Sequence, residues 1–551
     1  MGDMAQSEVL DLLHTPSIGS IFRVEVGMSI GMFLCSLCVV FVSVYRLQPP
    51  SVVPASAALT EFSAERAMEH LAALSNKPHP VGSEEHARVG KYIASQLTIL
   101  GLTPELQKTN SMTNIVARLK GTSGGKAVLL VAHYDTVPSS PGASDNSSSV
   151  AMLLEVLRAL KAGSPLSRDV VFLFSDGEEI GLLGAKAFAY GHQWAKEIAV
   201  VLNFDARGNS GSSIMFETGP ENGWLIRQFA SASPRPVATS LSHEIYKLLP
   251  NTTDFAIFKE AGFAGLEFAF INGINHYHTA NDTVAEVDRR SLQHQGANGL
   301  ALTSQLANEN LENVRAGDAI YFDLFSSAVV AYPARLALLF TAVIVLLFLA
   351  VITLGLRKGH LMIGGVAAGS VAILLSMFGA FVVVILIHWV IGLWRGAASQ
   401  NGFEMIVFAA TATAVAAFLF VLVLRRINTQ DLMVGGLCFW LVLMCVTVFV
   451  MPGASYLFTW PLLFNLVALA SMFARRSDKP WAVSHLVVLA LCALPGIILF
   501  VPVIYLTSIA LSLDSFGSLA ILTAVPVLLL GPFCPHLMVL SPNVHRRTLI
   551  Q

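Results

Sequence analysis

Two different hydrophobic patterns divide the chain. Between about residues 60 and 315, short apolar runs alternate with longer stretches in which apolar residues recur every three or four positions. The short runs predict buried strands at 127–133, 170–175, 199–204 and 264–270. The periodic stretches predict helices at 84–100, 146–161 and 288–310. This alternation predicts an α/β fold in which helices sandwich a mainly parallel mixed sheet.

Outside this region, the chain consists mostly of apolar runs long enough to cross a bilayer. The first covers residues 27–47. Seven more lie near 334–356, 361–389, 403–424, 432–451, 456–474, 482–508 and 516–540. Pro495 and Pro502 leave open whether the run 482–508 is one kinked helix or two short ones, so eight or nine spans are expected. The C-terminal half is therefore expected to be an all-α transmembrane bundle.

Basic residues in the loops between these runs predict the orientation of the chain. Four basic pairs fall on the same side if the N-terminus is cytosolic: Arg357-Lys358, Arg425-Arg426, Arg475-Arg476 and Arg546-Arg547. Cytosolic loops are enriched in Lys and Arg, so this side is assigned to the cytosol. Residues 48–333 then lie on the exoplasmic side.

These patterns predict seven segments along the chain. They are a cytosolic N-terminal segment 1–26, a transmembrane anchor 27–47, a linker 48–59, an exoplasmic domain 60–315, a linker 316–333, a transmembrane domain 334–540 of about seven helices, and a cytosolic tail 541–551. A cleaved signal peptide is the alternative to the anchor, because Ala55-Ser56-Ala57 resembles a cleavage site. The first apolar run is longer than a usual signal core, which favours the anchor.

Composition supports a lipid environment and excludes one class of partner. The chain is 54% hydrophobic and 13% charged, which is far from a soluble average and makes the bilayer an expected partner. Its formal net charge is -2 and it has no block of clustered Lys and Arg, so no nucleic-acid partner is expected. All six cysteines fall in apolar runs, which leaves the polar domain without a disulfide framework or a thiolate metal site.

Residues of the metal-ligand type follow each predicted strand. His133 closes the first strand, Asp145 lies in the Gly/Ser/Asn-containing loop after it, Glu178-Glu179 follow the second, Asp205 ends the third, and His278 follows the fourth. A single polar residue at a strand end is more often a turn former or a helix cap. A whole set drawn from His, Asp and Glu instead predicts a metal site, and mixed nitrogen and oxygen ligands favour zinc over calcium or magnesium.

The order of these motifs resembles a known family. The sequences HYD, ASDN, DGEEIGLLG, NFDARG and YHTANDT occur in the order typical of the M28 family of zinc aminopeptidases and carboxypeptidases. The flanking sequences KPHPVGSEEH (77–86), FETGPENGWL (216–225) and TTDFAIF (252–258), with the multi-span tail, resemble the membrane-bound branch of endoplasmic-reticulum metallopeptidases and vacuolar membrane proteases. The motif resemblance covers about residues 60 to 310.

The resemblance implies two zinc ions per chain. Asp145 would bridge them, with His133 and Asp205 completing one site and Glu179 and His278 the other. Two dications about 3.5 Å apart repel each other, and a bridging carboxylate makes such a pair tolerable.

The resemblance also assigns roles to residues that do not bind metal. Asp135 would orient the imidazole of His133, and Glu178 would act as general base toward the metal-bound hydroxide. Thr253, Asp254, Tyr277 and Arg207 are candidate substrate-binding residues. A helix N-cap explains Thr253 about as well, and an ordinary ion pair explains Arg207 about as well.

The expected function is therefore that of a membrane-anchored, zinc-dependent exopeptidase acting on peptides. An aminopeptidase is favoured over a carboxypeptidase. One alternative keeps the fold but makes the protein a single-zinc enzyme resembling glutaminyl cyclases. Another alternative makes it a transporter-type membrane protein with an exoplasmic binding domain, although the predicted spans hold few ionisable residues.

Potential glycosylation sites bear on the compartment of the domain. The sequons at Asn146, Asn251 and Asn281 all fall in the candidate site loops, where a glycan would block access. Unused sequons favour a bacterial periplasmic or extracellular location over an organelle lumen such as that of the endoplasmic reticulum or vacuole.

Overall fold

A computed structural model describes residues 18–109, 112–249, 252–395, 402–474, 483–510, 516–530 and 533. The chain forms two compact units, each built from segments that are distant in sequence. The helical unit comprises Met1–Ser43, Phe340–Val446 and Leu457–Gln551. The sheet unit comprises Val44–Leu339 and the short segment Thr447–Tyr456.

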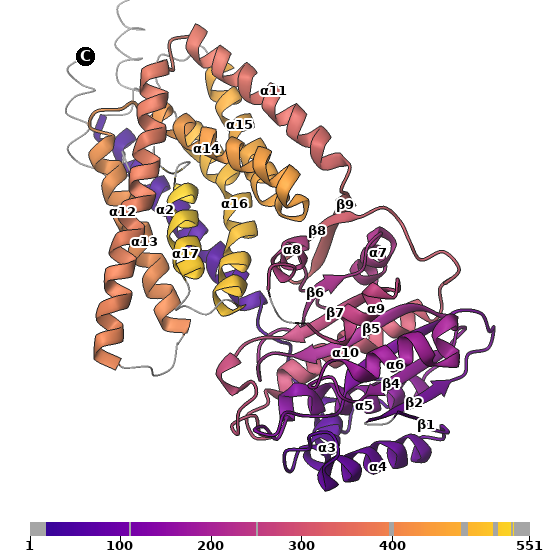
Figure 1. Ribbon diagram of the computed structural model, residues 1–551. Helices are drawn as coiled ribbons and strands as arrows, with labels where there is room; N and C mark the ends of the chain where they lie inside the picture. Colours follow the sequence, from indigo (N-terminus) through magenta and orange to yellow (C-terminus); the bar gives the residue numbers. More distant parts are fainter. Residues whose placement is uncertain are drawn as a thin grey trace, which may run out of the picture. The chain divides into compact units, whose positions relative to one another are not determined.

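The sheet unit is built on a mixed sheet of seven strands (Figure 1). The strands are β1 (Glu105–Lys108), β2 (Thr113–Leu119), β3 (Ala127–His133), β4 (Val170–Ser175), β5 (Ile198–Ala206), β6 (Ile214–Thr218) and β7 (Ala264–Phe270), in the spatial order β1-β2-β4-β3-β5-β7-β6. The inner strands β4, β3, β5 and β7 run parallel, whereas β1, β2 and β6 pair antiparallel. The predicted mainly parallel mixed sheet is confirmed, including all four predicted strands.

Helices cover both faces of this sheet. One face packs against residues of α3 (Ala64–Leu74), α4 (Glu84–Ile99), α5 (Ser149–Ala162), α7 (Gly223–Ala232) and α10 (Arg289–Leu306). The other face packs against α6 (Leu183–Gly191) and α9 (Asp254–Glu260). Three short helices, η2 (Gln193–Glu197), η3 (Ile274–His276) and α8 (Ser240–Tyr246), lie in the connections.

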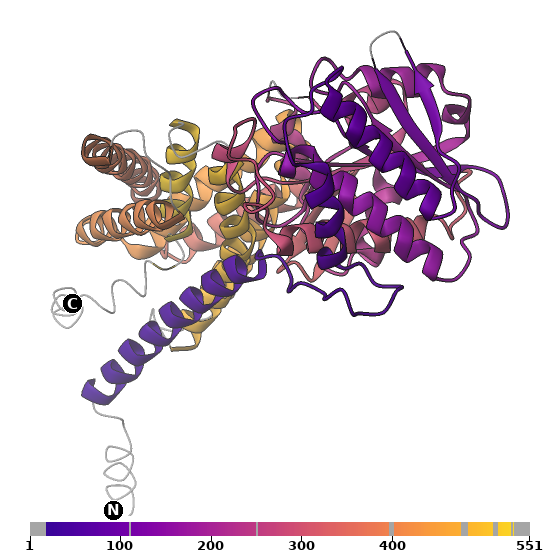
Figure 2. The same cartoon turned by 90° about the horizontal axis from the view of Figure 1, so that it is seen from below.

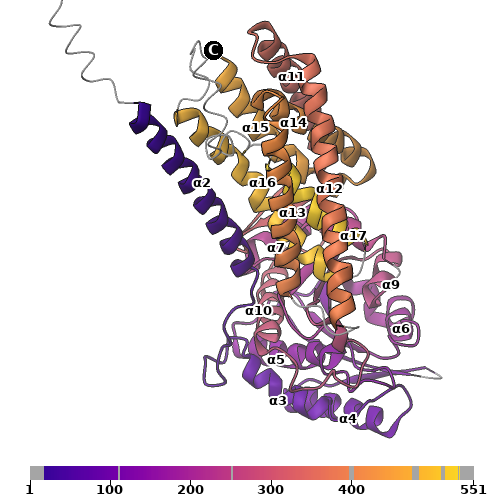
Figure 3. The same cartoon turned by 90° about the vertical axis from the view of Figure 1, so that its left-hand side faces the viewer.

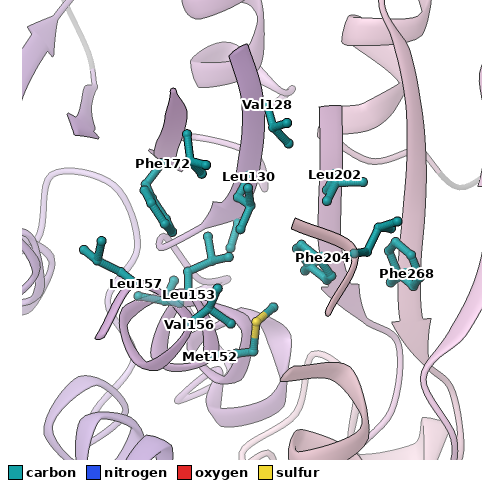
Figure 4. Packing of buried hydrophobic residues seen from close by; sticks show 14 of the residues in the cluster. Val128, Leu130, Met152, Leu153, Val156, Leu157, Phe172, Leu202, Phe204 and Phe268 are labelled. Carbon is teal, nitrogen blue, oxygen red and sulfur yellow. The ribbon is translucent and has the colours of Figure 1, made fainter. Parts of the chain in front are cut away.

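Alternate residues of the inner strands divide between the two cores. On the α5 face, Val128 and Leu130 of β3 pack with Phe172 of β4, and Met152 and Leu153 of α5 cover them (Figure 4). These side chains are fully buried, and each contributes roughly 1.5–3 kcal/mol by leaving water. Burial on both faces explains why the inner strands read as nearly continuous apolar runs.

The helix predicted at 146–161 begins differently from the expectation. A π-helical turn, η1 (Ala143–Ser148), comes first, and α5 starts only at Ser149. Inside η1, Asp145 and Asn146 have non-helical dihedral angles of φ -109°, ψ 94° and φ -131°, ψ 29°. The chain therefore turns sharply just before α5, which keeps Asp145 at the edge of the sheet.

The segment expected to be a linker, 316–333, forms a hairpin. Its strands are β8 (Ala319–Leu324) and β9 (Ala328–Pro333). The carboxylate of the half-buried Asp323 accepts hydrogen bonds from the main-chain amides of Ala238, at 3.2 Å, and Ser326, at 2.9 Å. These contacts involve a partner distant in sequence, which a local pattern does not reveal.

A short segment from between two apolar helices also belongs to the sheet unit. This segment, Thr447–Tyr456, contains the 3₁₀ turn η4 (Pro452–Ala454) and contacts α8 and β8. Ser240 donates a hydrogen bond to the Gly453 carbonyl at 2.7 Å, and the Gly453 amide donates to Glu244 at 3.2 Å. The ring of Tyr456 stacks on Phe322 with centroids 4.6 Å apart. The end of the segment, Gly453–Tyr456, is thus buried and specifically bonded to the sheet unit.

The helical unit contains long apolar helices. They are α2 (Ile18–Arg46), α11 (Leu336–Arg357), α12 (Ile363–Arg395), α13 (Gly402–Val423), α14 (Thr429–Val450), α15 (Tyr456–Ala474), α16 (Val483–Ala510) and α17 (Phe516–Leu530). Figure 2 shows α2 as one continuous indigo helix. Helices α12, α13 and α17 lie side by side (Figure 3). Pro495 and Pro502 both lie inside α16, which settles that run as one helix.

Among the described residues, six of these helices are long and apolar enough to cross a membrane. A seventh apolar stretch, Val407–Val423, is shorter. The chain is therefore a multi-pass membrane protein. Several positions that the sequence analysis named lie outside the described residues. They are the basic pairs Arg475-Arg476 and Arg546-Arg547, the chain ends 1–17 and 541–551, and the sequon residue Asn251.

The docking of the segment Thr447–Tyr456 predicts the effect of a methyl group at Gly453. A Cβ atom there would lie 2.7 Å from the Ser240 carbonyl oxygen and 2.9 Å from Glu244 Cγ. Gly453→Ala should therefore destabilise the sheet unit by about 1–3 kcal/mol, the usual cost of overpacking. Thermal unfolding of the purified full-length chain, followed by tryptophan fluorescence, measures this loss.

Gly191→Ala is the matched control, because a Cβ atom at Gly191, in α6, would meet nothing within 4 Å. This substitution should leave the unfolding temperature unchanged or raise it slightly. Equal unfolding temperatures for both variants would contradict the docking.

Candidate metal centre

The candidate site lies at the carboxyl ends of the parallel strands. In the sheet, β3 lies between β4 and β5. The chain adds β4 on one side of β3 and then crosses over to add β5 on the other side. The chain therefore changes direction at the carboxyl ends of β3 and β5, and open α/β sheets bind ligands at such points. His133 ends β3 and Asp205 lies near the end of β5, so the sheet itself places both residues at this point.

A first group of ligand-type side chains joins His133, Asp145 and Asp205. His133 Nε2 lies 3.2 Å from Asp145 Oδ1 and 3.7 Å from Asp205 Oδ1. All three residues are buried. His133 Nδ1 faces the main-chain oxygen of Asp135 at 3.1 Å, so Nδ1 carries the proton and Nε2 is turned toward the two carboxylates.

A second group joins Asp145, Glu179 and His278. His278 Nε2 lies 3.0 Å from Asp145 Oδ2 and 3.2 Å from Glu179 Oε1. Asp145 therefore contributes one carboxylate oxygen to each group. His278 has a positive φ of 59°, and its ring stacks on Tyr277 with centroids 3.8 Å apart.

The spacing and chemistry of both groups fit zinc. Two ligands bound tetrahedrally at about 2.0–2.1 Å from a Zn²⁺ ion are roughly 3.3 Å apart, and the distances above cluster around that value. Glu179 Oε1 and His278 Nε2 are buried atoms without a hydrogen-bond partner among the described residues. Burial alone would lower the pKa of His278, but Asp145 and Glu179 raise it to about 10. The site thus favours positive charge.

Asp135 is fully buried and holds the loop that carries the two glutamates. Its carboxylate accepts hydrogen bonds from the amides of Glu178, at 3.1 Å, and Glu179, at 3.2 Å. The same carboxylate lies 3.5 Å from His133 Nδ1, whose closer partner is the Asp135 main-chain oxygen. The principal contact of the Asp135 carboxylate is therefore with the Glu178-Glu179 backbone, in addition to the imidazole that the sequence suggested.

Glu178 lies beside both groups but belongs to neither. Burial raises the pKa of Glu178 well above its ordinary value, and the nearby carboxylates of Asp205 and Asp254 add to this effect. Burial likewise raises the pKa of Asp254 to about 7. A surplus of acidic groups therefore surrounds the ligand set, and a bound cation would favour their ionised forms.

The four candidate substrate-binding residues differ in their surroundings. Asp254 starts α9 and accepts a hydrogen bond from the Ser175 hydroxyl. The hydroxyl of Thr253 does not cap α9 and instead donates to Glu267. Arg207 Nε is buried without a hydrogen-bond partner among the described residues, so the expected ordinary ion pair is not seen there. Tyr277 lies against the ligand His278.

Sequence reasoning missed a second buried acidic pair near Asp205. Glu217 and Glu267 face each other across β6 and β7, and both are almost completely buried. Lys259 pairs with Glu217, and Asn203 donates to Glu267 at 3.0 Å. Burial, with the charge of Glu217, raises the pKa of Glu267 well above its ordinary value. The available signal was a single glutamate inside the otherwise apolar run 264–270.

Comparison with known proteins gives a consistent result for this region. The model of peptidase family M28 matches residues 114–303. Endoplasmic reticulum metallopeptidase 1 of Rattus norvegicus is 31% identical over 427 residues, which cover 69% of this chain and 47% of that protein. The vacuolar membrane protease of Candida tropicalis is 34% identical over 272 residues, which cover 45% of this chain and 30% of that protein. The chain thus spans half or less of the length of these curated relatives.

Solved structures of two enzymes are similar to part of this chain. The aminopeptidase from Aneurinibacillus sp. strain AM-1 is 14% identical, with a TM-score of 0.38, and the match covers 47% of this chain and 98% of that chain. Glutaminyl cyclase of Porphyromonas gingivalis is 21% identical, also with a TM-score of 0.38, and the match covers 45% of this chain and 100% of that chain.

The geometry predicts that Asp145 matters more for metal content than any other ligand. Asp145 belongs to both groups, so Asp145→Ala should abolish zinc binding. Asp205→Ala and Glu179→Ala each remove a member of one group and should reduce the zinc content only in part. Elemental analysis of the three purified variants measures zinc per chain. An Asp145→Ala protein with the zinc content of the unaltered chain would show that the two groups are not metal sites.

Proposed function

We propose that this chain is a membrane-anchored zinc exopeptidase of family M28 with two metal ions. The proposal is supported by the match of the M28 family model to residues 114–303, and by six helices among the described residues that are long and apolar enough to cross a membrane. The observation that carries the proposal is that Asp145 offers one oxygen to each of two complete ligand groups. Such an arrangement is what a bridged pair of metal ions requires.

In this proposal, zinc bound by the two groups would polarise the scissile carbonyl and make a water molecule acidic. Glu178 supplies the remaining proton chemistry. It lies beside both groups without belonging to either, so its carboxylate is free to accept the proton of the attacking water and deliver it to the leaving amine. The hydrogen bonds from the Glu178 and Glu179 amides to Asp135 hold the base in place.

The surroundings of the site favour an aminopeptidase. The buried carboxyl groups of Asp254 and Glu267 lie within electrostatic reach of Asp205, and the cationic amino terminus of a peptide would favour their ionised forms. Arg207 supports the competing carboxypeptidase activity, because its partner-free guanidinium nitrogen could bind a substrate carboxylate. Tyr277, stacked on His278, is positioned to contact the substrate in either case.

A single-zinc enzyme of the glutaminyl cyclase type is the second candidate. It shares the fold, but it needs only one ligand group, whereas this chain has two that share Asp145. The zinc content of the unaltered chain separates the candidates, since about one ion per chain would favour the cyclase.

We further propose that the sheet unit lies on the exoplasmic side. The basic pairs assign that side from the sequence, and the segment Thr447–Tyr456 is consistent with this assignment. This segment joins α14 to α15 and is predicted to be an exoplasmic loop, and it belongs to the sheet unit. The names of the relatives, which refer to endoplasmic reticulum and vacuole, shift the proposal from a bacterial membrane toward an organelle lumen. Asn146 is fully buried, which is consistent with an unused sequon there.

Substitution of Glu178 tests the proposed base. Glu178→Gln keeps the size of the side chain but removes the proton acceptor, so zinc content should stay near two ions per chain. The rate of peptide hydrolysis should fall by about 10²–10⁴-fold, the usual range for general-base catalysis. The matched variant Glu179→Gln should instead lower zinc content, and added zinc should partly restore its activity. A Glu178→Gln protein with unaltered turnover, or one that loses its zinc, rejects this role.

Labelling of introduced cysteines tests the orientation. Leu248, which is 76% exposed beyond α8, represents the sheet unit, and the exposed Lys358 follows α11. A membrane-impermeant maleimide should reach Leu248→Cys only from the lumenal or external side, and Lys358→Cys only from the cytosol. The unaltered chain, whose cysteines lie in apolar runs, gives the background. Labelling of both positions from one side would refute the orientation.

A further inference from the structure

Three successive main-chain amides around Asp145 are bound by a single residue, Asp282. Asp282 Oδ1 accepts a hydrogen bond from the Ser144 amide at 2.7 Å, and Oδ2 accepts one from the Asp145 amide at 3.2 Å. The main-chain oxygen of Asp282 accepts a third from the Ala143 amide at 3.2 Å. Asp282 is 1% exposed, so these bonds form away from bulk water.

The backbone around Asp145 needs such a partner. All six residues of η1 are buried, and the non-helical angles at Asp145 and Asn146 interrupt the regular helical hydrogen bonding. A buried amide left without an acceptor costs about 1–3 kcal/mol. Gly142, with φ 65°, permits the close turn into this segment, because a Cβ atom there would lie 2.2 Å from Thr136 Cγ2. Asp282 therefore satisfies the amides that this turn exposes.

The position of Asp282 connects this support to the metal ligands. Asp282 follows His278 in the same loop, and it belongs to neither ligand group. His278 contacts the Asp145 carboxylate, while Asp282 binds the Asp145 backbone. Asp135 bonds the Glu178 and Glu179 amides in the same bidentate manner. Two buried carboxylates that are not ligands thus each hold a ligand-bearing segment.

We propose that Asp282 is a positioning residue that fixes the Asp145 carboxylate between the two metal sites. The inference rests on the proposed metal-dependent function. Through its two oxygens, the Asp282 side chain sets both the place and the direction of the chain at Asp145. Its loss should loosen the one ligand that both groups share, and so should weaken binding of both ions.

Asp282→Asn tests this role, because asparagine keeps the shape but offers only one acceptor oxygen. Its amide group would also place a donor against one of the two main-chain donors. Zinc affinity, measured by titration of the chelator-stripped full-length protein, should fall about 10–100-fold, the usual effect of losing a residue that orients a ligand. The rise in unfolding temperature on adding zinc should shrink accordingly.

Asp288→Asn is the matched control. Asp288 lies in the same stretch and also accepts a hydrogen bond from a main-chain amide, that of Arg290, at 2.8 Å, but it caps α10 rather than a ligand segment. Asparagine is an equally good cap, so both zinc affinity and stability should stay unchanged. Cobalt in place of zinc gives a second measurement, since its visible spectrum reports ligand geometry and should change in Asp282→Asn only.

Four outcomes are decisive. Weaker zinc binding together with an altered cobalt spectrum supports the assignment. A zinc affinity and a cobalt spectrum equal to those of the unaltered chain overturn it. The assignment is also overturned if Asp282→Asn lowers the unfolding temperature by the same amount with and without zinc, because such a loss indicates a purely structural role. If Asp282→Asn does not fold, Asp282→Glu takes its place under the same criteria. An unaltered chain that binds neither zinc nor cobalt would instead refute the proposed function.

Discussion

Crowding of buried negative charge at one edge of the sheet is the constraint on which the rest of the site depends. Carboxylates from Asp145, Glu179 and Asp205 meet there because parallel strands end at the same edge. Two imidazoles, of His133 and His278, accompany them, and although burial alone would lower the pKa of each, the neighbouring carboxylates raise it. Like charges at this spacing repel each other, so a cation bound among them would stabilise the ionised carboxylates.

The main chain around the site is held by a repeated device. The buried carboxylates of Asp135 and Asp282 each accept hydrogen bonds from the main-chain amides of two successive residues. Burial raises the pKa of Asp282, and the hydrogen bonds from the amides oppose this effect, whereas at Asp135 the His133 imidazole and the amides together outweigh burial and lower the pKa. These hydrogen bonds fix the main chain of the ligand segments, although the segments lie in loops and carry several small residues.

Much of the fold and of the site could be predicted because both follow from local patterns. Strands such as 127–133 and 264–270 are apolar throughout, and residues beyond parallel strands must converge. Three features could not be predicted in the same way. They are the docking of the hairpin β8–β9 on Ala238, the pairing of Glu217 with Glu267, and the role of Asp282. Each depends on a contact between residues far apart in sequence, such as Asp323 with Ala238 or Ser144 with Asp282. Periodicity carries no information on such contacts.

The membership of Thr447–Tyr456 in the sheet unit has a consequence for the order of events during synthesis. Helices α11 to α14 separate this segment from Leu339, so the ribosome must add about 100 residues before the sheet unit is complete, which takes roughly 5–20 s. During that time, the surfaces of α8 and β8 that receive Gly453 and Tyr456 are uncovered. Completion of the sheet unit is thus coupled to the insertion of later helices into the membrane. A chaperone could act on α8 and β8 before Thr447–Tyr456 has been synthesised.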